Sequence, residues 1–234
     1  MFDNTFQRFT QVCIDHGFTC RGKAFFRVLG DGVLQVLKFE YQPGFPGNHY
    51  LSVGLFSLYG ELMKQWFTSG GCIPRYDIVQ LIGLHSTTIL HEKDGFVTFK
   101  EISPEQQLDI LIKKGFPWLD QIATQEQLAE AICEMDKRWN DDLKYAPYLA
   151  IGDFGAAAKV IRAILAQHKS ALESNLKWMQ GEQAENYQNC LDAEDIQFQR
   201  KLELAEREDW NEIRKYLDEN YVRNVKYAKF CMKK

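Results

Sequence analysis

The sequence lacks the motifs that most often reveal an activity. Its six cysteines form no C-x-x-C pair and no spacing typical of a disulfide framework or a zinc site. Its glycines form no G-x-G-x-x-G fingerprint between a strand and a helix, which a dinucleotide-binding fold requires. These absences exclude the usual sequence signatures of disulfide-rich, zinc-binding and dinucleotide-binding proteins, and we predict neither a cofactor nor a metal site.

Long apolar runs and a basic surface are also missing. No uninterrupted apolar stretch approaches the length of a membrane span, and the first residues lack the basic start and apolar run of a signal peptide. The formal charge is −4, and only the short tail beyond residue 219 is rich in lysine and arginine without acids. DNA-binding proteins usually carry a clustered basic face. We therefore predict a cytoplasmic protein with reduced thiols, no membrane segment and no nucleic-acid partner.

Aliphatic and aromatic residues, in contrast, are plentiful. Hydrophobic residues make up 45% of the chain and aromatic residues 13%, including 16 Phe, 10 Tyr and 5 Trp. That content is enough for a packed core and is not typical of a disordered chain. A length of 234 residues allows either one large domain or two small ones.

The chain begins with the pattern of an amphipathic helix. Phe2, Phe6, Phe9 and Cys13 recur at steps of four, three and four, which predicts one apolar stripe along the helix. Gly17 follows at the place where a helix C-cap needs a positive φ angle, so we expect the helix to end there.

Strand patterns follow this helix and flank a glycine-containing turn. Residues 24–29 have β character, and Gly30-Asp31-Gly32 tolerates the positive φ angles that a tight hairpin needs. Residues 33–42 alternate apolar and charged side chains from Leu37 onward, which predicts a sheet with one buried face and one wet face. Residues 51–55 continue as a third strand, and residues 87–100 predict a further hairpin. We expect four or five antiparallel strands.

Several positions in this region have a spacing that resembles a known family. They are Phe6, Gly17-Phe18, Phe25-Phe26-Arg27, Asp31-Gly32-Val33-Leu34-Gln35-Val36, Phe39 and Gln42. With this spacing, about the first hundred residues resemble an uncharacterised bacterial family catalogued only as a domain of unknown function. The resemblance implies a short helix followed by a meander of antiparallel strands, and it brings no catalytic residue. The long helical remainder departs from what we expect of that family.

Helix signals dominate the sequence from Ser103 onward. Ser103 with Gln106, and Thr124 with Gln127, have the spacing of capping boxes, and Gly115 is expected to end the first of these helices.

Three more helical segments are predicted beyond them. The first is a short turn or helix over residues 147–151 that closes at Gly152, the second is a long helix capped by Asp153, and the third is a last helix or pair of helices through residues 196–221.

We therefore predict an α+β fold. An N-terminal helix packs on an antiparallel sheet of four or five strands, and an all-helical C-terminal half follows. The sheet module would occupy residues 1–102 and the helical region residues 103–234. No linker rich in glycine, serine or proline separates them, so we expect the helical region to pack on or beside the sheet, and one continuous domain is the alternative.

Catalytic candidates are few. Cys72 follows two glycines and is the candidate nucleophile, with His85 or His91 as its base. No local signature accompanies these residues, and an ordinary, partly buried cysteine is the stronger interpretation of Cys72.

A cysteine–histidine group at the end of the first helix is a second candidate. Cys13, His16 and Cys20 could approach one another, but a closed zinc site needs four ligands and no fourth is evident. Cys13 already belongs to the apolar stripe, so core packing explains it better.

The last third of the chain offers a different kind of site. Residues 182–219 are strongly acidic, and most of these acids lie on the polar side of a helical pattern, which is typical of a solvated face. As a binding surface they would suit a basic partner, because complementary charge accelerates association. The candidate partner-binding residues are Glu203, Glu206, Glu208, Asp209 and Glu212.

The most concrete functional hypothesis is a non-enzymatic, protein-binding protein. It would be a bacterial immunity protein, or antitoxin, that neutralises a basic toxin domain by covering its active site. Two alternatives stay open. One is an enzyme with an unrecognised site that uses Cys72 and a histidine, and the other is a helical scaffold that assembles with itself through its C-terminal helices.

Overall fold

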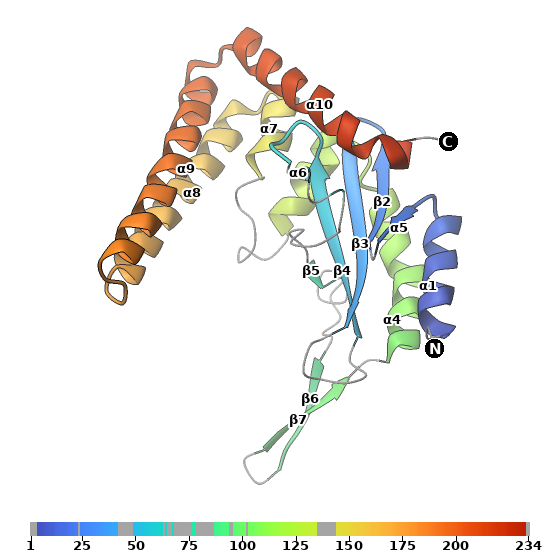
Figure 1. Cartoon of the computed structure of the whole chain (residues 1–234). Helices are drawn as coiled ribbons and strands as arrows, with labels where there is room; N and C mark the ends of the chain where they lie inside the picture. Colours follow the sequence, from blue (N-terminus) through green and yellow to red (C-terminus); the bar gives the residue numbers. More distant parts are fainter. Residues whose placement is uncertain are drawn as a thin grey trace.

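The computed structural model of the chain describes residues 4–22, 24–41, 49–62, 64, 67, 76–77, 87–93, 96–101, 103–134 and 144–232. Figure 1 shows a central sheet with helices against it and a long helical hairpin that extends away from it. The predicted α+β class is confirmed, because an N-terminal helix, an antiparallel sheet and a helical C-terminal half follow one another along the chain. Among the described helices, none is long and apolar enough to cross a membrane.

The main sheet is an antiparallel meander in the order β1-β2-β3-β4-β5. Its strands are β1 (Thr19–Arg21), β2 (Ala24–Leu29), β3 (Val33–Tyr41), β4 (His49–Ser57) and β5 (Tyr76–Asp77). The predicted hairpin beyond it is confirmed as β6 (Thr87–Lys93) paired with β7 (Phe96–Glu101), and these two strands form a separate sheet.

The predicted turn at Gly30-Asp31-Gly32 is confirmed. Leu29 pairs with Val33, so these three residues reverse the chain between β2 and β3. Gly30 and Gly32 have φ angles of +37° and +75°, which a residue with a Cβ rarely adopts. The N–H of Asp31 donates to the carbonyl of Ala123 at 3.2 Å, so the turn is also anchored to the helical part of the chain.

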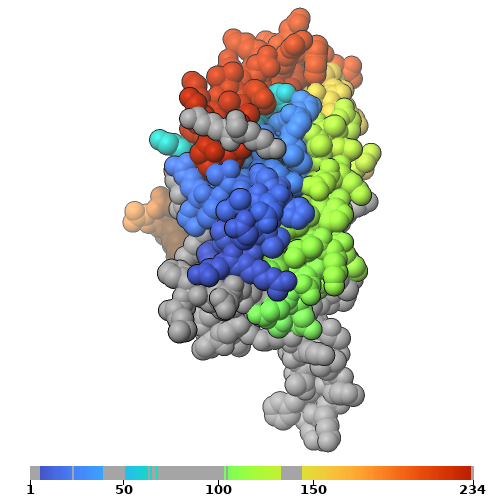
Figure 2. Space-filling model, turned by 90° about the vertical axis from the view of Figure 1, so that its right-hand side faces the viewer, coloured from blue at the N-terminus to red at the C-terminus, as the bar shows by residue number. Residues whose placement is uncertain are grey.

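One face of the sheet is covered by the first helix and by helices that follow the strands. These elements are α1 (Asn4–Asp15), α4 (Pro104–Ile110), the π-helical turn η1 (Leu111–Gly115), α5 (Phe116–Asp120) and α6 (Gln125–Glu134). Figure 2 shows α1 beside the green helical segment on one side of the molecule. Phe9 of α1 packs edge-on against Phe25 of β2, with ring centroids 5.0 Å apart. Leu37, Phe116 and Leu128 belong to the same core, so residues before and after position 103 are packed together.

The second face of the sheet is covered by α10 (Trp210–Met232), so the prediction of a wet face is wrong. Phe26 and Leu34 are buried on this side with Ala228 of α10, and Phe26 meets Phe230 edge-on at 5.2 Å between ring centroids. The alternation that suggested a wet face begins only at Leu37. Residues 33–37 are all buried, which is the continuous pattern of a sheet covered on both faces.

The helix that begins after Ser103 continues past the position predicted for its end. The capping box is confirmed, since the N–H of Gln106 donates to Ser103 Oγ at 3.3 Å and the N–H of Ser103 donates to Gln106 Oε1 at 2.9 Å. The prediction that Gly115 ends the helix is wrong, because the chain passes through η1 directly into α5. Pro117 would clash with the preceding turn of a regular helix, and the wider π turn just before it lets the helix continue.

The C-terminal half consists of α7 (Tyr145–Ile151), α8 (Phe154–Asn175), α9 (Glu182–Arg207) and α10. The predicted signals are confirmed: Gly152 ends α7 with a φ angle of +79°, and Asp153 caps α8 by accepting the N–H of Ala156 at 2.9 Å. The predicted last helix or pair is a pair. α9 ends at Arg207, the next residue, Glu208, has a φ angle of +53°, and α10 begins at Trp210.

Candidate functional site

The predicted nucleophile, Cys72, lies outside the part of the chain that the structure describes. Cys72 and His85 are not among the described residues, and His91 lies on β6 opposite Thr98 of β7. The hypothesis of a Cys72–histidine site therefore stays a prediction.

The cysteines and the histidine at the end of α1 do not form a metal site. Cys13 is fully buried in the core, and burial raises the pKa of its thiol, which keeps it protonated and unsuited to hold a metal. The ring of His16 stacks on Phe116 at 3.7 Å between centroids, whereas Cys20 is exposed. Within the described residues, no group of three or more His, Cys, Asp or Glu could hold a metal ion. The core-packing interpretation of Cys13 is confirmed.

The five predicted partner-binding acids lie where α9 passes into α10, and we call residues 203–212 the elbow. Glu203, Glu206 and Glu208 are exposed there. Glu206 forms an ion pair of 2.6 Å with Arg162 of α8. This contact holds the end of α9 against α8 and occupies one of the five acids.

Two of the other elbow acids make contacts with neighbouring residues of α9 and α10. Asp209 caps α10, because its Oδ1 accepts the N–H of Glu212 at 3.2 Å. Glu212 in turn forms an ion pair of 3.2 Å with Arg207. Glu203 and Glu208 are the two acids of this group whose side chains have neither an ion pair nor a capping hydrogen bond among the described residues, so they are the freest to meet another protein.

The elbow belongs to a longer acidic segment. Residues 182–212 contain ten acidic and three basic side chains, which gives a formal charge of −7. One of the three bases, Lys201, is buried, so the charge that faces water is more negative still. Trp210 is 41% exposed, and its ring lies 5.7 Å from that of Phe154. A half-exposed tryptophan among carboxylates is a surface suited to contact with cationic side chains.

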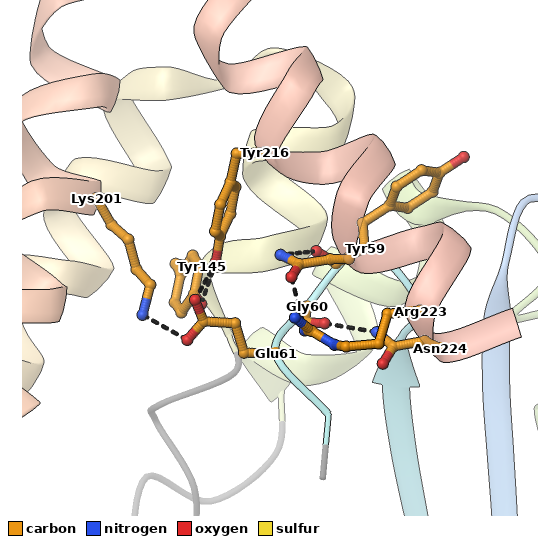
Figure 3. Close-up of polar contacts among 9 residues, drawn as sticks. Tyr59, Gly60, Glu61, Tyr145, Lys201, Tyr216, Arg223 and Asn224 are labelled. Carbon is orange, nitrogen blue, oxygen red and sulfur yellow. Dashed lines mark hydrogen bonds and ion pairs between the residues drawn. The ribbon is translucent and has the colours of Figure 1, made fainter. Parts of the chain in front are cut away.

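A set of polar residues that was not predicted from the sequence joins the sheet to the helices (Figure 3). Glu61 follows β4, and its carboxylate accepts hydrogen bonds from Lys201 Nζ at 2.7 Å and from the Tyr216 hydroxyl at 3.1 Å. The hydroxyl of Tyr145 lies 3.0 Å from that of Tyr216. Two helices, α9 and α10, therefore bind one carboxylate from the sheet side, and α7 is joined to them through Tyr216.

Hydrogen bonds from α10 also hold the backbone of residues 58–60, which precedes Glu61. The side-chain amide of Asn224 donates to the carbonyls of Leu58 and Gly60 at 2.7 and 2.6 Å, and that of Asn220 donates to the carbonyl of Tyr59 at 3.1 Å. Both asparagines lie on α10 and are buried. A buried carbonyl without a donor would cost about 1–3 kcal/mol, so these bonds keep the 58–60 backbone against α10.

We call this cluster the polar junction; its side chains are Glu61, Tyr145, Lys201, Tyr216, Asn220 and Asn224. The Lys201 ammonium also lies over the ring of Phe198, 4.6 Å from its centroid. Burial, helped by the negative charge of Glu61, raises the pKa of Tyr216, which therefore stays protonated and donates. Because both oxygens of Glu61 already accept hydrogen bonds, the junction acts as a structural contact between distant parts of the chain.

The sequence contains a signal for one side of this junction. Asn220 and Asn224 continue the apolar stripe of Leu217 on α10, and Lys201 interrupts a similar stripe on α9. A polar side chain on an apolar helix face is expected to be buried and to need a partner. The partner of Lys201 could not be found in this way, because Glu61 lies 140 positions earlier in the chain.

Comparisons with known proteins return no relative. No protein-family model, no curated protein and no solved structure matches this chain. The resemblance of the first hundred residues to an uncharacterised bacterial family therefore stays a prediction.

Proposed function

We propose that this chain is a non-enzymatic, protein-binding protein, and most concretely a bacterial immunity protein that neutralises a basic toxin domain. The observation that carries the proposal is the elbow, which contains the exposed acids Glu203 and Glu208 and the half-exposed Trp210. A negative surface steers a positively charged domain and accelerates its association. Tryptophan is enriched among the side chains that dominate binding energies.

The polar junction supports the same proposal, because it holds the helices that carry the elbow. Lys201 lies on α9 just before the elbow and Tyr216 lies on α10 just after it, and both bind Glu61. A surface that is fixed before binding loses less conformational entropy when the partner arrives.

The test is binding to a basic toxin domain, such as one encoded beside this gene, measured over a range of salt concentrations. The double variant Glu203→Lys/Glu208→Lys reverses the two elbow acids that have neither an ion pair nor a capping hydrogen bond among the described residues. We expect the association rate constant to fall by about tenfold at low salt. The fall should be smaller at high salt, because ions screen the exposed charges.

A matched control is Glu126→Lys/Glu130→Lys, which reverses two exposed acids four positions apart on α6. This variant should change the association rate far less. Equal losses in both variants would contradict the elbow as the binding surface. Absence of binding to every basic toxin domain tried would remove the proposal itself.

Self-assembly through the C-terminal helices is a second candidate function. It is favoured by exposed apolar side chains at the α8–α9 hairpin, where Trp178 is 86% and Ile196 is 54% exposed. Light scattering on the same samples separates the two candidates, because a monomer mass at high concentration counts against self-assembly and leaves toxin binding open.

A further inference from the structure

The helical hairpin formed by α8 and α9 is buried only at its base. Its buried side chains include Ile161 and Ile164 on α8 and Phe198 and Leu202 on α9. Residues 165–197, all of which are described, contain no buried residue. Figure 1 shows this part of the hairpin projecting from the body of the molecule. The residues at the base therefore decide in which direction the hairpin points.

Polar contacts tie the two helices of the hairpin to each other. His168 Nδ1 lies 2.7 Å from Asp195 Oδ1, and Asn175 donates to the hydroxyl of Tyr187 at 2.7 Å. Each contact joins α8 to α9, and neither reaches the sheet. The hairpin is thus connected internally, and these contacts do not hold its direction relative to the sheet.

Two kinds of contact hold the base. The first is apolar packing of α8 and α9 on α7 and α10, to which Tyr59 contributes. Such packing resists separation of the helices but has little directional preference. The second is ion pairing, which is directional when it has hydrogen-bond geometry. The exposed Arg207–Glu212 pair joins α9 to α10, and exposed pairs contribute little. The pair between Lys201 and Glu61, in which Nζ and Oε2 are 2.7 Å apart, joins α9 to the segment that follows β4.

The two sides of this ion pair differ in their exposure. The side chain of Lys201 is 6% exposed, whereas that of Glu61 is 40% exposed. The ammonium is held among the rings of Phe198 and Tyr145, and it depends on the carboxylate for its charge partner. Glu61 can be hydrated if the lysine is removed, so replacing Lys201 is the milder way to break the pair.

We infer that the Lys201–Glu61 pair is a lock that fixes the direction of the α8–α9 hairpin relative to the sheet, and that the sheet folds without it. Buried ion pairs often add little net stability, and in some proteins they specify one arrangement among several. The two cores that cover the sheet support the second part of the inference. Neither core, as described, contains a residue of α8 or α9.

Native cysteines allow the direction of the hairpin to be measured. Cys20 lies on β1 and Cys190 lies on α9, and both are exposed. Spin labels on these two thiols report the distance between sheet and hairpin by pulsed electron resonance. Serine would replace the other cysteines except the buried Cys13; these are Cys72, Cys133 and Cys231.

The parent protein should give one narrow distance distribution. Lys201→Met removes the charge while keeping an apolar side chain of similar length against Phe198, and we expect a distribution about twofold wider or more. Glu61→Gln should widen it as well. The matched control Lys169→Met, which changes an exposed lysine on α8, should leave the distribution narrow.

Three outcomes would overturn the inference. A Lys201→Met distribution as narrow as that of the parent would mean that apolar packing alone sets the direction. Hydrogen exchange that loses protection in β2 and β3 together with α9 would mean that sheet and hairpin open as one unit. Failure of both Lys201→Met and Glu61→Gln to fold would also contradict it, because the inference requires the sheet to fold without the lock.

Discussion

Gly30 and Gly32 form the two sides of the turn between β2 and β3, and each faces a different helical layer. A Cβ on Gly30 would collide with the carbonyl oxygen of Ala123, which precedes α6. A Cβ on Gly32 would lie 3.0 Å from the ring of Tyr221 on α10. Both glycines also have positive φ angles. The turn therefore needs glycine for its shape and for its contacts with the helices on both sides of the sheet.

Replacing Gly30 by alanine should be costly. Gly30→Ala combines a positive φ angle with a collision against backbone, so we expect the free energy of unfolding to fall by about 2 kcal/mol or more. Urea unfolding measures this loss. Gly155→Ala is the control, because the nearest atom to its added Cβ is Asp153 Oδ1 at 3.8 Å and alanine favours a helix by up to about 1 kcal/mol. Equal midpoints for Gly30→Ala and the parent would contradict the prediction.

At the scale of elements, α10 has different contacts along its length. Its first residue, Trp210, belongs to the acidic elbow. Its middle supplies Asn220 and Asn224 to the polar junction, and its last turns place Ala228 and Phe230 against the sheet. One helix thus connects the proposed binding surface, the polar junction and the core that lies between α10 and the sheet.

Asn224→Asp tests the middle of this helix. Asn224 is fully buried and donates to two carbonyl oxygens, so an aspartate would place a carboxylate against two acceptors. We expect a loss of about 3–5 kcal/mol at neutral pH, the usual cost of an uncompensated buried charge.

The control for this prediction is Asn175→Asp on α8. Its side-chain amide meets the hydroxyl of Tyr187, which can rotate and donate to a carboxylate, so the loss should be below about 1 kcal/mol. Chemical unfolding of the two variants gives the comparison. Similar losses in both would mean that the two carbonyl contacts of Asn224 contribute little.

Sequence patterns that involve residues only a few positions apart correctly predict where several helices begin or end. Ser103 and Asp153 could be identified as caps because each accepts a hydrogen bond from a residue three positions later. The helix that covers the second face of the sheet could not be identified, because its contacts are distant: Asn224 and Leu58 are separated by 166 positions. The strand pattern shows that a face is apolar, but it does not show which helix covers it.

The candidate site, too, could be predicted from the sequence only in part. The sequence shows that the elbow is acidic, since that is a property of composition. It does not show that Glu206 is paired with Arg162, because that arginine lies on another helix, 44 positions earlier. Glu203 and Glu208 could be singled out from the predicted acids only after the ion pairs were known.

At the scale of the whole molecule, four buried or half-buried groups respond to alkaline pH in the same direction. Burial raises the pKa of Cys231 to about 11 and that of Tyr59 to about 12, where the nearby Asp31 adds to the effect. Burial also raises the pKa of Cys13 and of Tyr216. Cys13 lies in the core between the sheet and α1, and Cys231 lies beside the core between the sheet and α10. Tyr59 and Tyr216 lie at the polar junction, so the effects of the four groups on stability add over the whole fold.

The free energy of unfolding should therefore fall as the pH rises above about 9. In the unfolded chain these groups lose their protons at the ordinary pKa of 9.0 for cysteine and 10.0 for tyrosine, whereas the folded chain still holds them. The unfolded state then binds fewer protons, so the stability is complete below about pH 9 and declines through the window from 9 to 12. Denaturant midpoints measured under reducing conditions at about pH 8, 9.5 and 10.5 test this, and Cys231→Ala should make the decline between 9 and 11 shallower. A midpoint that stays constant or rises across this range would contradict the prediction, because it would mean that these groups release their protons as readily in the folded chain as in the unfolded one.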